Sequence, residues 1–503
     1  MTQDQDARIP VIDLFAGPGG LGEGFASLCD GNGEPIFRIA LSVEMDPAAH
    51  RTLELRAFFR HLKTAAAHRD YLRYVGQQEP TIASRNALFN AYPEARDAAV
   101  AEAVCHRLTD ETRGLTKARA AAAVDEAPIW VLVGGPPCQA YSLVGRSRRA
   151  GDETFGSDEK HTLYLHYLHL IEDLQPPVFV MENVKGILSA NLSDENTFSK
   201  VKLDLETAGV GYSVVPFVAR AEETQPYMPG DYVIRAEAHG VPQARHRVIL
   251  LGIREGLGVV FDKLQPREER VSVASVLSGL PRLRSRLSGR YGTPRDSEQA
   301  WEAVLRGAAD KVRPRLPDVA AYAADVVSDG WRHKDEAVGG GSTSPAGRDL
   351  AAWYVGVGGV ETPLNHEPRS HRADDLERYL FCASFAQVKG RSPKLSDFPE
   401  SLSPRHMNVA DGKFVDRFRV QLAGQPASTV TSHISKDGHY YIHYDASQCR
   451  ALTVREAARL QTFPDDYFFE GTRTQQYHQV GNAVPPFLAR QLAGVVARGL
   501  GRG

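Results

Sequence analysis

The stretch Trp130-Val131-Leu132-Val133-Gly134-Gly135-Pro136-Pro137-Cys138-Gln139 decides the fold of this chain. Its first half is apolar and β-branched, and it stops at two glycines and two prolines, which neither extend a strand nor begin a helix. We therefore predict a buried strand that ends just before Cys138. In an open α/β sheet, ligands bind outside the carboxyl ends of the strands. The alternative for a single cysteine is a small side chain packed in the core, but the stiff Gly-Gly-Pro-Pro loop favours a presented thiol.

Two more predicted strands end in polar or glycine-rich residues. Val178–Met181 runs into Glu182 and Asn183, and Val11–Phe15 runs into a glycine-rich loop at 16–20. If the three strands are parallel neighbours, a thiol, a carboxylate and a glycine loop meet at one edge of the sheet. The sequence therefore predicts a functional site at that edge.

Five short motifs resemble those of the bacterial DNA cytosine-5 methyltransferases and follow that family's order. They are DLFAGPGG at 13–20, GGPPCQ at 134–139, ENV at 182–184, QARHR at 243–247 and GNAV at 481–484. Together they span nearly the whole chain, and five ordered motifs are far more specific than any one of them. The resemblance implies an α/β fold, the Rossmann-like fold of the S-adenosylmethionine-dependent methyltransferases, with a mixed, mostly parallel sheet and an inserted target recognition domain.

The activity that this resemblance implies is methylation of DNA. A methyl group passes from S-adenosyl-L-methionine to C5 of a flipped-out cytosine in a specific duplex DNA sequence. The implied biological role is restriction-modification or host defence. The implied partners are double-stranded DNA and a cognate restriction endonuclease or defence system.

The composition is that of a large protein without an overall basic charge. The chain has 503 residues, 42% of them hydrophobic, a formal net charge of -3 and a pI of about 6.6. Contacts to DNA must therefore come from a local basic surface. No apolar run approaches the roughly 18 residues of a membrane span, and residues 1–8 are polar and acidic, so we expect neither a membrane segment nor a signal peptide. We expect a cytoplasmic, nucleoid-associated monomer.

The five cysteines are odd in number and scattered along the chain. No CxxC pair is present, so zinc and a disulfide framework are both disfavoured, and we predict no metal site. A free, reactive thiol persists best in a reducing compartment, which agrees with the cytosol.

Changes in composition divide the chain into domains. Residues 1–254 are predicted to form the first part of a catalytic domain. Within them 47–127, rich in Ala, Arg, Glu and Leu, is predicted to be a helical insertion broken by prolines. Residues 255–425, with frequent arginine and a Gly-Ser-rich loop, form the predicted target recognition domain, since the catalytic motifs stop before this segment and resume after it. Residues 426–503 complete the catalytic domain.

Two helices are predicted in that closing segment. Thr453 and Glu456 predict a capping box at the start of the first helix, and Pro464 lies just beyond its end. An apolar helix follows from about Phe487 to Ala497.

The predicted cofactor pocket begins at the first glycine loop. Backbone N–H groups of such a loop can approach a ligand closely, and the P-loop lysine is missing. Glu44, at the end of the next predicted strand, can accept hydrogen bonds from ribose hydroxyls; a solvated surface carboxylate is the alternative. By resemblance, the segment around 482–484 folds back beside the glycine loop, whereas the residue that contacts the adenine stays open. The predicted cofactor-binding residues are Phe15, Ala16, Gly17, Gly19, Gly20, Glu44, Met45, Pro136, Leu163, Asn482, Ala483 and Val484.

The predicted catalytic residues follow from the chemistry of cytosine. Its C5 is a poor nucleophile until a thiolate adds to C6, and Cys138 fits that reversible addition. An acid is then needed at N3, and Glu182 fits if an apolar pocket keeps it protonated near neutrality. Arg245 and Arg247 offer cationic forks for the cytosine O2 and a nearby phosphate. From its family position Arg247 is the better candidate for the base, and a structural salt bridge is the alternative.

A polar, basic segment follows the cysteine, at 140–151. Its glycines and arginines are typical of a loop that closes on a phosphate-bearing substrate, and a solvated charged loop is the alternative. The target cytosine must leave the stacked duplex to be reached. The predicted substrate-binding residues are Gln139, Ser142, Arg146 and Asn183.

Three alternative functions fit parts of the sequence. A tRNA cytosine-5 methyltransferase of the same fold carries a Cys-Phe-Thr signature that is missing here. A catalytically inactive DNA-binding partner would not need Cys138, Glu182 and Arg247 together. A dinucleotide-dependent oxidoreductase would explain the first glycine loop and Glu44 but not the Pro-Pro-Cys motif.

Overall fold

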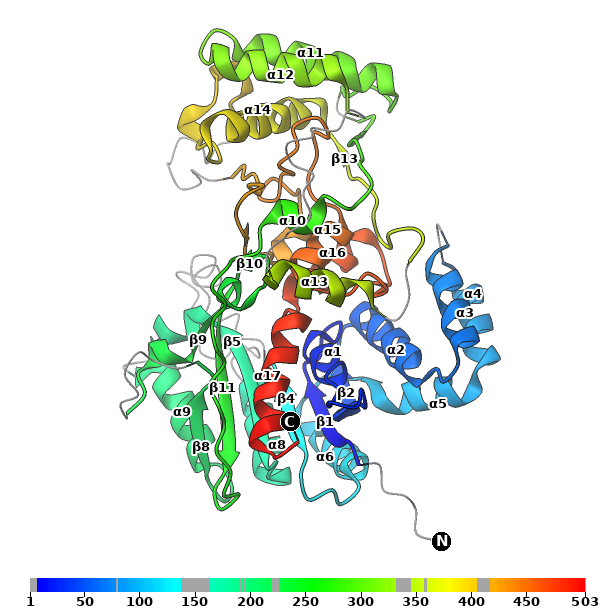
Figure 1. Ribbon diagram of the computed structural model, residues 1–503, viewed down its shortest axis with the longest axis vertical. Helices are drawn as coiled ribbons and strands as arrows, with labels where there is room; N and C mark the ends of the chain where they lie inside the picture. Colours follow the sequence, from blue (N-terminus) through cyan, green and yellow to red (C-terminus); the bar gives the residue numbers. More distant parts are fainter. Residues whose placement is uncertain are drawn as a thin grey trace.

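The computed structural model describes residues 7–77, 80–136, 163–189, 191–192, 195–218, 226–290, 292–331, 345–356, 360–404 and 417–502. The molecule is elongated, with a β-sheet at one end and a layer of helices at the other (Figure 1). The predicted residues Cys138, Gln139, Ser142 and Arg146 lie outside the described residues.

An eight-stranded sheet, in the order β3-β2-β1-β4-β5-β11-β8 with β9 paired to β11, forms the centre of the catalytic part. Neighbours from β3 to β5 are parallel, and β11 is antiparallel to β5, β8 and β9. The three strands whose ends carry the predicted site are therefore parallel neighbours, which is the condition under which those ends meet at one edge. The strands are β1 (Ile9–Leu14), β2 (Phe37–Glu44), β3 (Ala103–Cys105), β4 (Val131–Gly134), β5 (Val178–Val184), β8 (Tyr212–Pro216), β9 (Val233–Arg235) and β11 (His246–Arg254).

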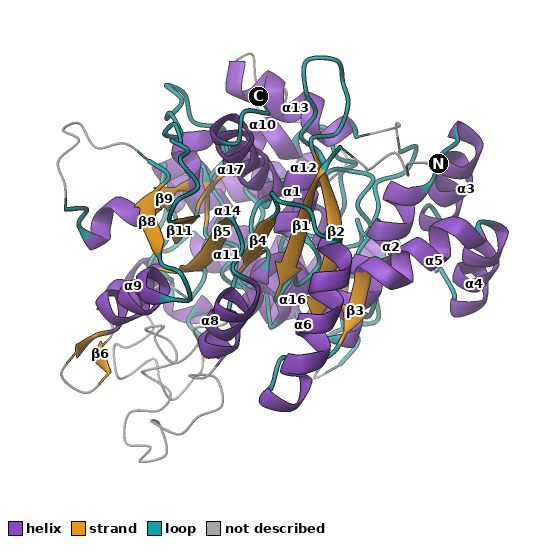
Figure 2. Cartoon of the chain, turned by 90° about the horizontal axis from the view of Figure 1, so that it is seen from below, coloured by secondary structure: helices purple, strands orange, loops and turns teal. Residues whose placement is uncertain are grey.

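Helices cover both faces of the sheet, which makes a three-layer structure (Figure 2). Alternate strand residues belong to different hydrophobic clusters, because successive side chains of a strand point to opposite faces. Val131 and Val133 pack with α1 (Gly20–Ala26) and α17 (Pro486–Gly499), whereas Leu132 packs with the helices of the other face. Those helices are α6 (Asp110–Val124), α8 (Leu163–Leu174) and α9 (Thr197–Thr207).

The stretch 47–127 is mostly helical but contains one strand. Helices α2 (Pro47–His61), α3 (Ala65–Val75), α4 (Ile82–Ala91) and α5 (Pro93–Glu102) lead to β3, which pairs in parallel with the end of β2. β3 was not predicted, because a strand of only three residues directly after a helix carries too short an apolar pattern. This part of the chain therefore adds an edge strand to the sheet as well as helices.

A helical layer lies at the end of the molecule far from the sheet (Figure 1). Helices α11 (Glu298–Val312), α12 (Pro317–Asp329) and α14 (Ala373–Lys389) pack together there. Their core is continuous with buried residues of the closing segment such as Leu452 and Tyr477. Shorter elements join the two ends of the molecule: α10 (Val273–Leu277), β12 (Arg286–Leu287), α13 (Pro345–Val355) and β13 (Ser370–His371).

The chain returns to the sheet through short elements and three helices. β10 (Gln243–Ala244) pairs in parallel with β14 (Ala427–Ser428). α15 (Val454–Leu460) begins with the predicted capping box, since the N–H of Thr453 donates to Glu456 Oε2 at 2.7 Å and the N–H of Glu456 donates to Thr453 Oγ1 at 3.2 Å. α16 (Arg473–Asn482) precedes α17, and a small hairpin of β6 (Asn191–Leu192) and β7 (Glu195–Asn196) completes the described strands.

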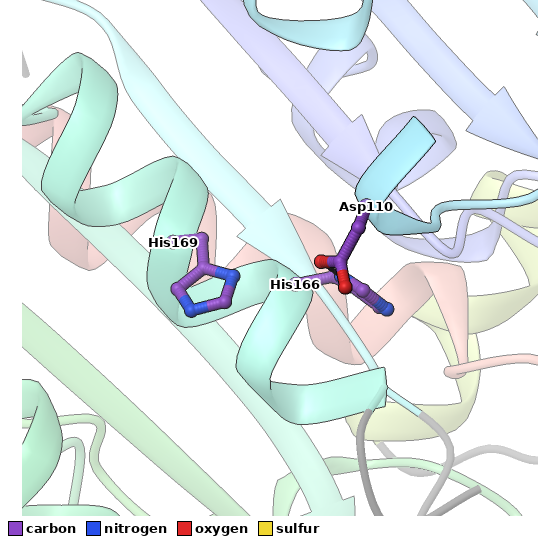
Figure 3. A group of neighbouring side chains, drawn as sticks. All are labelled: Asp110, His166 and His169. Carbon is purple, nitrogen blue, oxygen red and sulfur yellow. Dashed lines mark ion pairs between the residues drawn. The ribbon is translucent and has the colours of Figure 1, made fainter. Parts of the chain in front are cut away.

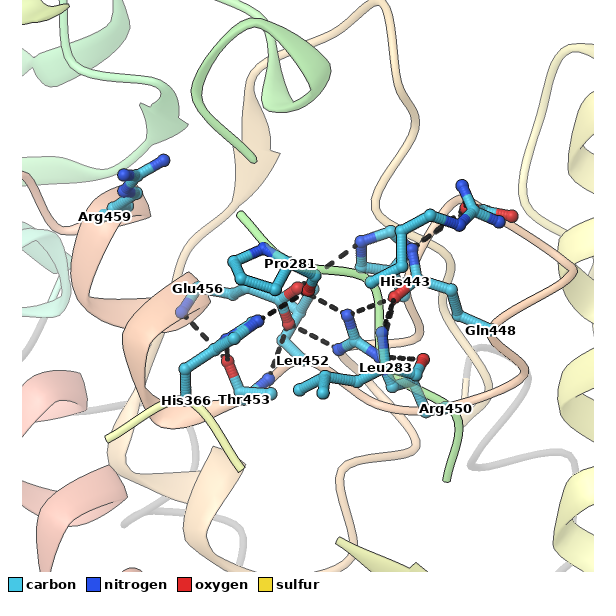
Figure 4. A network of polar contacts seen from close by, with 12 residues as sticks. Pro281, Leu283, His366, His443, Gln448, Arg450, Leu452, Thr453, Glu456 and Arg459 are labelled. Carbon is cyan, nitrogen blue, oxygen red and sulfur yellow. Dashed lines mark hydrogen bonds and ion pairs between the residues drawn. The ribbon is translucent and has the colours of Figure 1, made fainter. Parts of the chain in front are cut away.

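A buried polar network surrounds the start of α15 (Figure 4). The guanidinium of Arg450 donates to both carboxylate oxygens of Glu456 at 2.6 Å, and both side chains are 1% exposed. Arg450 also donates to the carbonyl of Leu283 at 3.0 Å, and His366 contacts Thr453 Oγ1 at 2.9 Å. The network therefore ties the inserted part of the chain to the closing segment. No described helix is both long enough and apolar enough to cross a membrane.

Candidate active site

Two predicted site residues meet where β5 and β11 run side by side. Glu182 lies near the carboxyl end of β5, and Arg247 lies at the start of the antiparallel β11. The guanidinium Nε of Arg247 is 2.9 Å from Glu182 Oε1, and the two side chains are 15% and 13% exposed. Arg247 Nη1 also donates to the carbonyl of His246 at 2.9 Å. The structure thus gives the Glu182 carboxylate a cationic partner, whereas the proton-donating role of Glu182 was made conditional on an apolar pocket.

The Gly-Gly-Pro segment after β4 lies directly beside this pair. A Cβ atom added to Gly135 would lie 3.3 Å from Glu182 Oε2. The amide of Asn183 donates to the carbonyl of Pro136 at 3.5 Å, and its Oδ1 accepts from the N–H of Val184 at 2.8 Å. The glycine permits the close approach, and the asparagine joins the ends of β4 and β5. Described structure stops at Pro136, two residues before Cys138.

Arg245 is placed differently from Arg247. Its side chain is buried, and its Nη1 donates to the carbonyl of Val430 at 2.8 Å and to that of Gly481 at 3.5 Å. Burial, aided by the neighbouring Arg247, lowers the pKa of Arg245 to about 9. These contacts connect the segment after β14 with the end of α16, which favours a role for Arg245 in holding the chain around the site.

The glycine loop after β1 has the backbone geometry of a ligand-binding turn. Phe15, Gly17 and Gly19 have φ values of 56°, 57° and 92°. Glycine adopts such values freely, but a bulky residue such as Phe15 rarely does, and strain of this kind often occurs at functional sites. A Cβ atom on Gly17 would meet nothing within 4 Å. Gly17 therefore borders open space at the carboxyl end of β1.

Glu44 lies across from that loop at the end of β2. Its Oε2 accepts from the N–H of Gly17 at 2.8 Å, and its Oε1 accepts from the N–H of Asp46 at 2.7 Å. Burial raises the pKa of Glu44. Met45 beside it is 56% exposed. A carboxylate beside exposed backbone and an apolar side chain suits a nucleoside with its ribose hydroxyls, so the residues present fit the predicted cofactor.

The closing segment completes the loop from the other side. A Cβ atom on Gly20 would lie 2.2 Å from the carbonyl oxygen of Val484, so only glycine fits at that contact. Val484 and Ala483 are buried, whereas Asn482 is exposed and pairs with His478 at 3.3 Å. The segment that carries GNAV therefore folds back beside the first glycine loop, as expected. Ala16, Pro136 and Leu163 are also buried at this edge of the sheet.

Two residues support the loop without having been predicted as site residues. The hydroxyl of Tyr467 donates to the carbonyl of Pro18. Asp13, fully buried, accepts from the N–H of Gly22 at 3.2 Å, and its other oxygen has no partner among the described residues. Burial raises the pKa of Asp13 to about 8. Asp13 belongs to the DLFAGPGG motif, but nothing in the sequence links Tyr467 to Pro18.

The end of β3 borders the same edge but carries no carboxylate. Cys105 pairs with Glu44 across β2 and β3. The next residue, His106, makes a 2.8 Å hydrogen bond with Thr116 Oγ1, and burial lowers its pKa. The residue that would contact the adenine therefore stays open.

Among the described residues, one group of side chains could hold a metal ion (Figure 3). Asp110 begins α6, and His166 and His169 lie one turn apart on α8, with ligand atoms within 4.8 Å of one another. Asp110 is 82% exposed, and its carboxylate is 3.8 Å from His166 Nδ1. Zinc bonds of about 2.0–2.2 Å would require the three side chains to move closer together. We assign this group no part in the site.

The fold and this edge of the sheet define the class of the protein. A mostly parallel sheet with a glycine loop after β1, an acidic residue after β2 and a closing segment against the loop is the Rossmann-like fold of the S-adenosylmethionine-dependent methyltransferases. A solved structure of a DNA modification methyltransferase encoded within an E. coli prophage shares this fold, with a TM-score of 0.51 over 98% of this chain and 99% of that chain at 20% identity.

Comparison of sequences identifies the family within that class. The family model of the C-5 cytosine-specific DNA methylases matches residues 114–278 and 369–498. The chain is 32% identical over 505 residues to the type II methyltransferase M.Bpa9945I of Bacillus paralicheniformis, with 97% of each chain covered. It is 26% identical over 490 residues to M1.HphI of Haemophilus parahaemolyticus, with 97% of this chain and 87% of the relative covered. The chain therefore belongs to the C-5 cytosine-specific DNA methylases and is a DNA (cytosine-5-)-methyltransferase.

Proposed function

We propose that this enzyme methylates C5 of a flipped-out cytosine in duplex DNA through a covalent bond between Cys138 and C6. The observation that carries the proposal is the 2.9 Å pair of Glu182 and Arg247, which lies beside the Gly135–Pro136 segment leading into Cys138. An acid and a guanidinium at one edge of the sheet, with a thiol two residues further along the chain than Pro136, suit addition to a pyrimidine ring. The wider arrangement of a glycine loop closed by Val484 supports the same site.

Each residue has a distinct role in this mechanism. The Cys138 thiolate forms the bond to C6, which moves electron density into the ring. In the free enzyme the Glu182 carboxylate faces Arg247, so Glu182 must first take up a proton from solvent; it then donates that proton to N3, and Arg247 contacts O2. Arg245 and Asn183 hold the segments around the base. Once C5 carries the methyl group, the C5 proton passes to water, the C6–S bond breaks to restore the thiolate, and the N3 proton returns to Glu182, which releases neutral product.

The cofactor is S-adenosyl-L-methionine, which the family and the fold imply. When bound, it supplies an electrophilic methyl group. The residues that would hold it are the glycine loop, Glu44, Met45, Leu163 and Asn482 to Val484. Backbone N–H groups and the Glu44 carboxylate would orient it beside Cys138.

The remaining chain would select the DNA sequence. We propose that residues 255–425 form the target recognition domain, inserted between a first catalytic part, 1–254, and a completion, 426–503. The family match supports this division, since its gap at 279–368 falls inside the proposed domain. The relatives M.Bpa9945I and M1.HphI are type II methyltransferases, which supports a restriction-modification role with a cognate endonuclease.

Labelled methyl transfer from S-adenosyl-L-methionine tests the proposal. The wild-type protein should label duplex DNA and not tRNA, and Cys138→Ala should reduce labelling to background. Bisulfite sequencing of DNA from cells that express the protein should then reveal one methylated sequence. Labelling of tRNA alone, or labelling that survives Cys138→Ala, would refute the mechanism.

A variant at the acid tests its role separately from folding. Glu182→Gln keeps a hydrogen-bonding side chain of the same shape but cannot donate the proton at N3. We expect kcat to fall by about 10²–10⁴-fold with little change in the KM for DNA. Steady-state kinetics at saturating cofactor measure both constants. An unchanged kcat would exclude Glu182 as the acid.

A further inference from the structure

A small pocket lies in the inserted part of the chain, away from the sheet edge described above. It encloses about 210 Å³ between the loop after β12, the strand β13 with the start of α14, and the segment 436–439. Arg290, Arg369, His371 and Lys436 are among its lining residues. Arg372 and His439 bring the nitrogen-bearing side chains of the lining to six, against two carboxylates, and this excess suits an anionic ligand.

Two of these side chains are buried and incompletely bonded. Arg369 is 9% exposed and donates to the carbonyl of Lys436 at 3.0 Å and to that of Ile434, while its face lies 3.8 Å from the Tyr477 ring. Its Nε has no partner among the described residues, and neither has Nε2 of His371, which is 6% exposed. Burying an unpaired polar group costs about 1–3 kcal/mol. Both atoms are covered by surrounding protein atoms, so a group in the pocket could reach them only after neighbouring side chains move.

The rim of the pocket adds positive charge. Arg290 and Lys436 are exposed, and no ion pair is recorded for either within the described ranges. Arg372, also at the rim, is already paired with Asp374 at 3.0 Å. The charges of Arg290 and Lys436 are therefore available to a ligand, and the buried Arg369 adds its positive charge behind them.

The two carboxylates that line the pocket already have cationic partners. Asp375 lies 3.0 Å from Arg378 Nη1, and Asp437 lies 3.5 Å from Arg417 Nη2. The histidines add no charge near neutrality, since burial lowers the pKa of His371 to about 3 and also lowers that of His439. The pocket therefore keeps a net positive charge.

A continuous segment joins this pocket to the active site. The carbonyls that Arg369 contacts belong to residues 434 and 436, and the carbonyl that Arg245 contacts belongs to Val430. Between them, the short helix Ser432–Ser435 packs against α16, which ends at Asn482. A ligand in the pocket would thus be held in a fixed position relative to the residues around the target base.

We propose that this pocket binds a phosphate group of the DNA backbone and so fixes the register of the duplex relative to the active site. The proposal rests on the proposed action on DNA. A planar guanidinium and an ammonium group are well suited to phosphate oxygens. Because Arg290 and Lys436 contact the backbone and not the bases, their contribution is independent of sequence.

A double variant, Arg290→Ala with Lys436→Ala, tests the proposal without disturbing the buried residues. Arg286→Ala is the matched control, because Arg286 is exposed in β12 but does not line the pocket. We expect the double variant to bind duplex DNA about 10–100-fold more weakly, whether or not the DNA carries the methylated sequence. The logarithm of the association constant for DNA falls with the logarithm of the salt concentration, and the steepness of this slope should decrease by about 1–2 in the double variant. Arg286→Ala should change the DNA affinity and the salt slope by less than the double variant does.

The outcomes separate failure of the pocket from failure of the proposed function. If wild-type protein and variants bind DNA equally, the pocket proposal is wrong while the action on DNA stands. The same conclusion follows if the control loses as much affinity as the double variant. If the wild type binds and methylates no duplex DNA, the proposed function itself fails. Protection of the wild type against heat by inorganic phosphate, without any effect of the double variant on DNA binding, would reassign the pocket to a free anion.

Discussion

Asp13 is a fully buried carboxyl beneath the glycine loop, and its burial makes the loop sensitive to pH. Burial raises the pKa of Asp13 from 3.8 to about 8. Between these values the folded protein holds a proton that the unfolded chain has lost, so stability falls as the pH rises through this window. Asp13→Asn cannot titrate and still offers an oxygen to the N–H of Gly22. We expect the melting temperature of the variant, relative to wild type, to increase between about pH 5 and pH 8 and then to level off.

Thermal unfolding of the two proteins over a series of buffers checks this expectation. A difference in melting temperature that stays constant with pH would show that Asp13 is ionised in the folded protein. Affinity for S-adenosyl-L-methionine, measured by calorimetry, should change little, since the hydrogen bond that the Asp13 side chain makes with the described residues goes to the N–H of Gly22, which an asparagine oxygen can still accept.

Helices α1 and α17 pack against each other next to the glycine loop. The close packing of the two helices depends on Gly24. A Cβ atom on Gly24 would lie 2.4 Å from the Cβ of Ala489 and 2.6 Å from the carbonyl of Pro486. Gly24→Ala should therefore push the helices apart and lower the free energy of unfolding by about 1–3 kcal/mol. Because α1 begins at the glycine loop, affinity for the cofactor should fall as well.

Gly114→Ala is the matched control, because Gly114 lies in α6 and a Cβ atom there would meet nothing within 4 Å. It should raise the free energy of unfolding by about 0.5–1 kcal/mol, as alanine favours the helix. Urea unfolding and calorimetric titration measure both variants. Equal effects of the two substitutions would mean that the close packing of α1 on α17 does not stabilise the protein.

The main strands were predictable because each one is an apolar run ended by glycine, proline or a polar residue. β1, β4 and β5 satisfy this rule. The motifs at the ends of these strands placed Glu182 and Asn183 at one edge of the predicted sheet. β3 was not predicted, because the strand Ala103-Val104-Cys105 is short and follows a helix directly. α11 is hard to see because alanines such as Ala308 and Ala309 fill part of its buried face.

The site residues that lie in sequence motifs were predictable. Glu182 and Arg247 lie in two different motifs, and both were named from the sequence before the structure showed their pairing. The hydrogen bond from Tyr467 to Pro18 joins residues 449 positions apart in the sequence, and no local sequence pattern predicts it. The contacts of Arg245 with Val430 and Gly481 span 185 and 236 positions. Such pairs are set by how the closing segment packs on the sheet.

The two ends of the molecule are joined through the buried network around Arg450 and Glu456, and that network should make the whole protein sensitive to acid. Burial acts to raise the pKa of Glu456, but the Arg450 guanidinium outweighs it and holds that pKa well below its usual range. Burial and Arg450 also lower the pKa of His443. In both cases the unfolded chain takes up protons first as the pH falls. Stability is therefore lost below about pH 6.5 for His443 and below about pH 4.5 for Glu456.

Glu456→Gln tests this coupling, because it leaves the buried Arg450 without its charged partner. Breaking a buried ion pair costs about 3–5 kcal/mol, so the free energy of unfolding should fall by that amount at neutral pH. The deficit should shrink below about pH 4.5, where the wild type loses the contribution of Glu456. Glu302→Gln, in an exposed pair with Arg306 on α11, should cost less than about 0.5 kcal/mol. Urea unfolding at both pH values measures these effects. A loss at Glu456 no larger than at Glu302, or one that does not change with pH, would show that the network does not hold the two ends together.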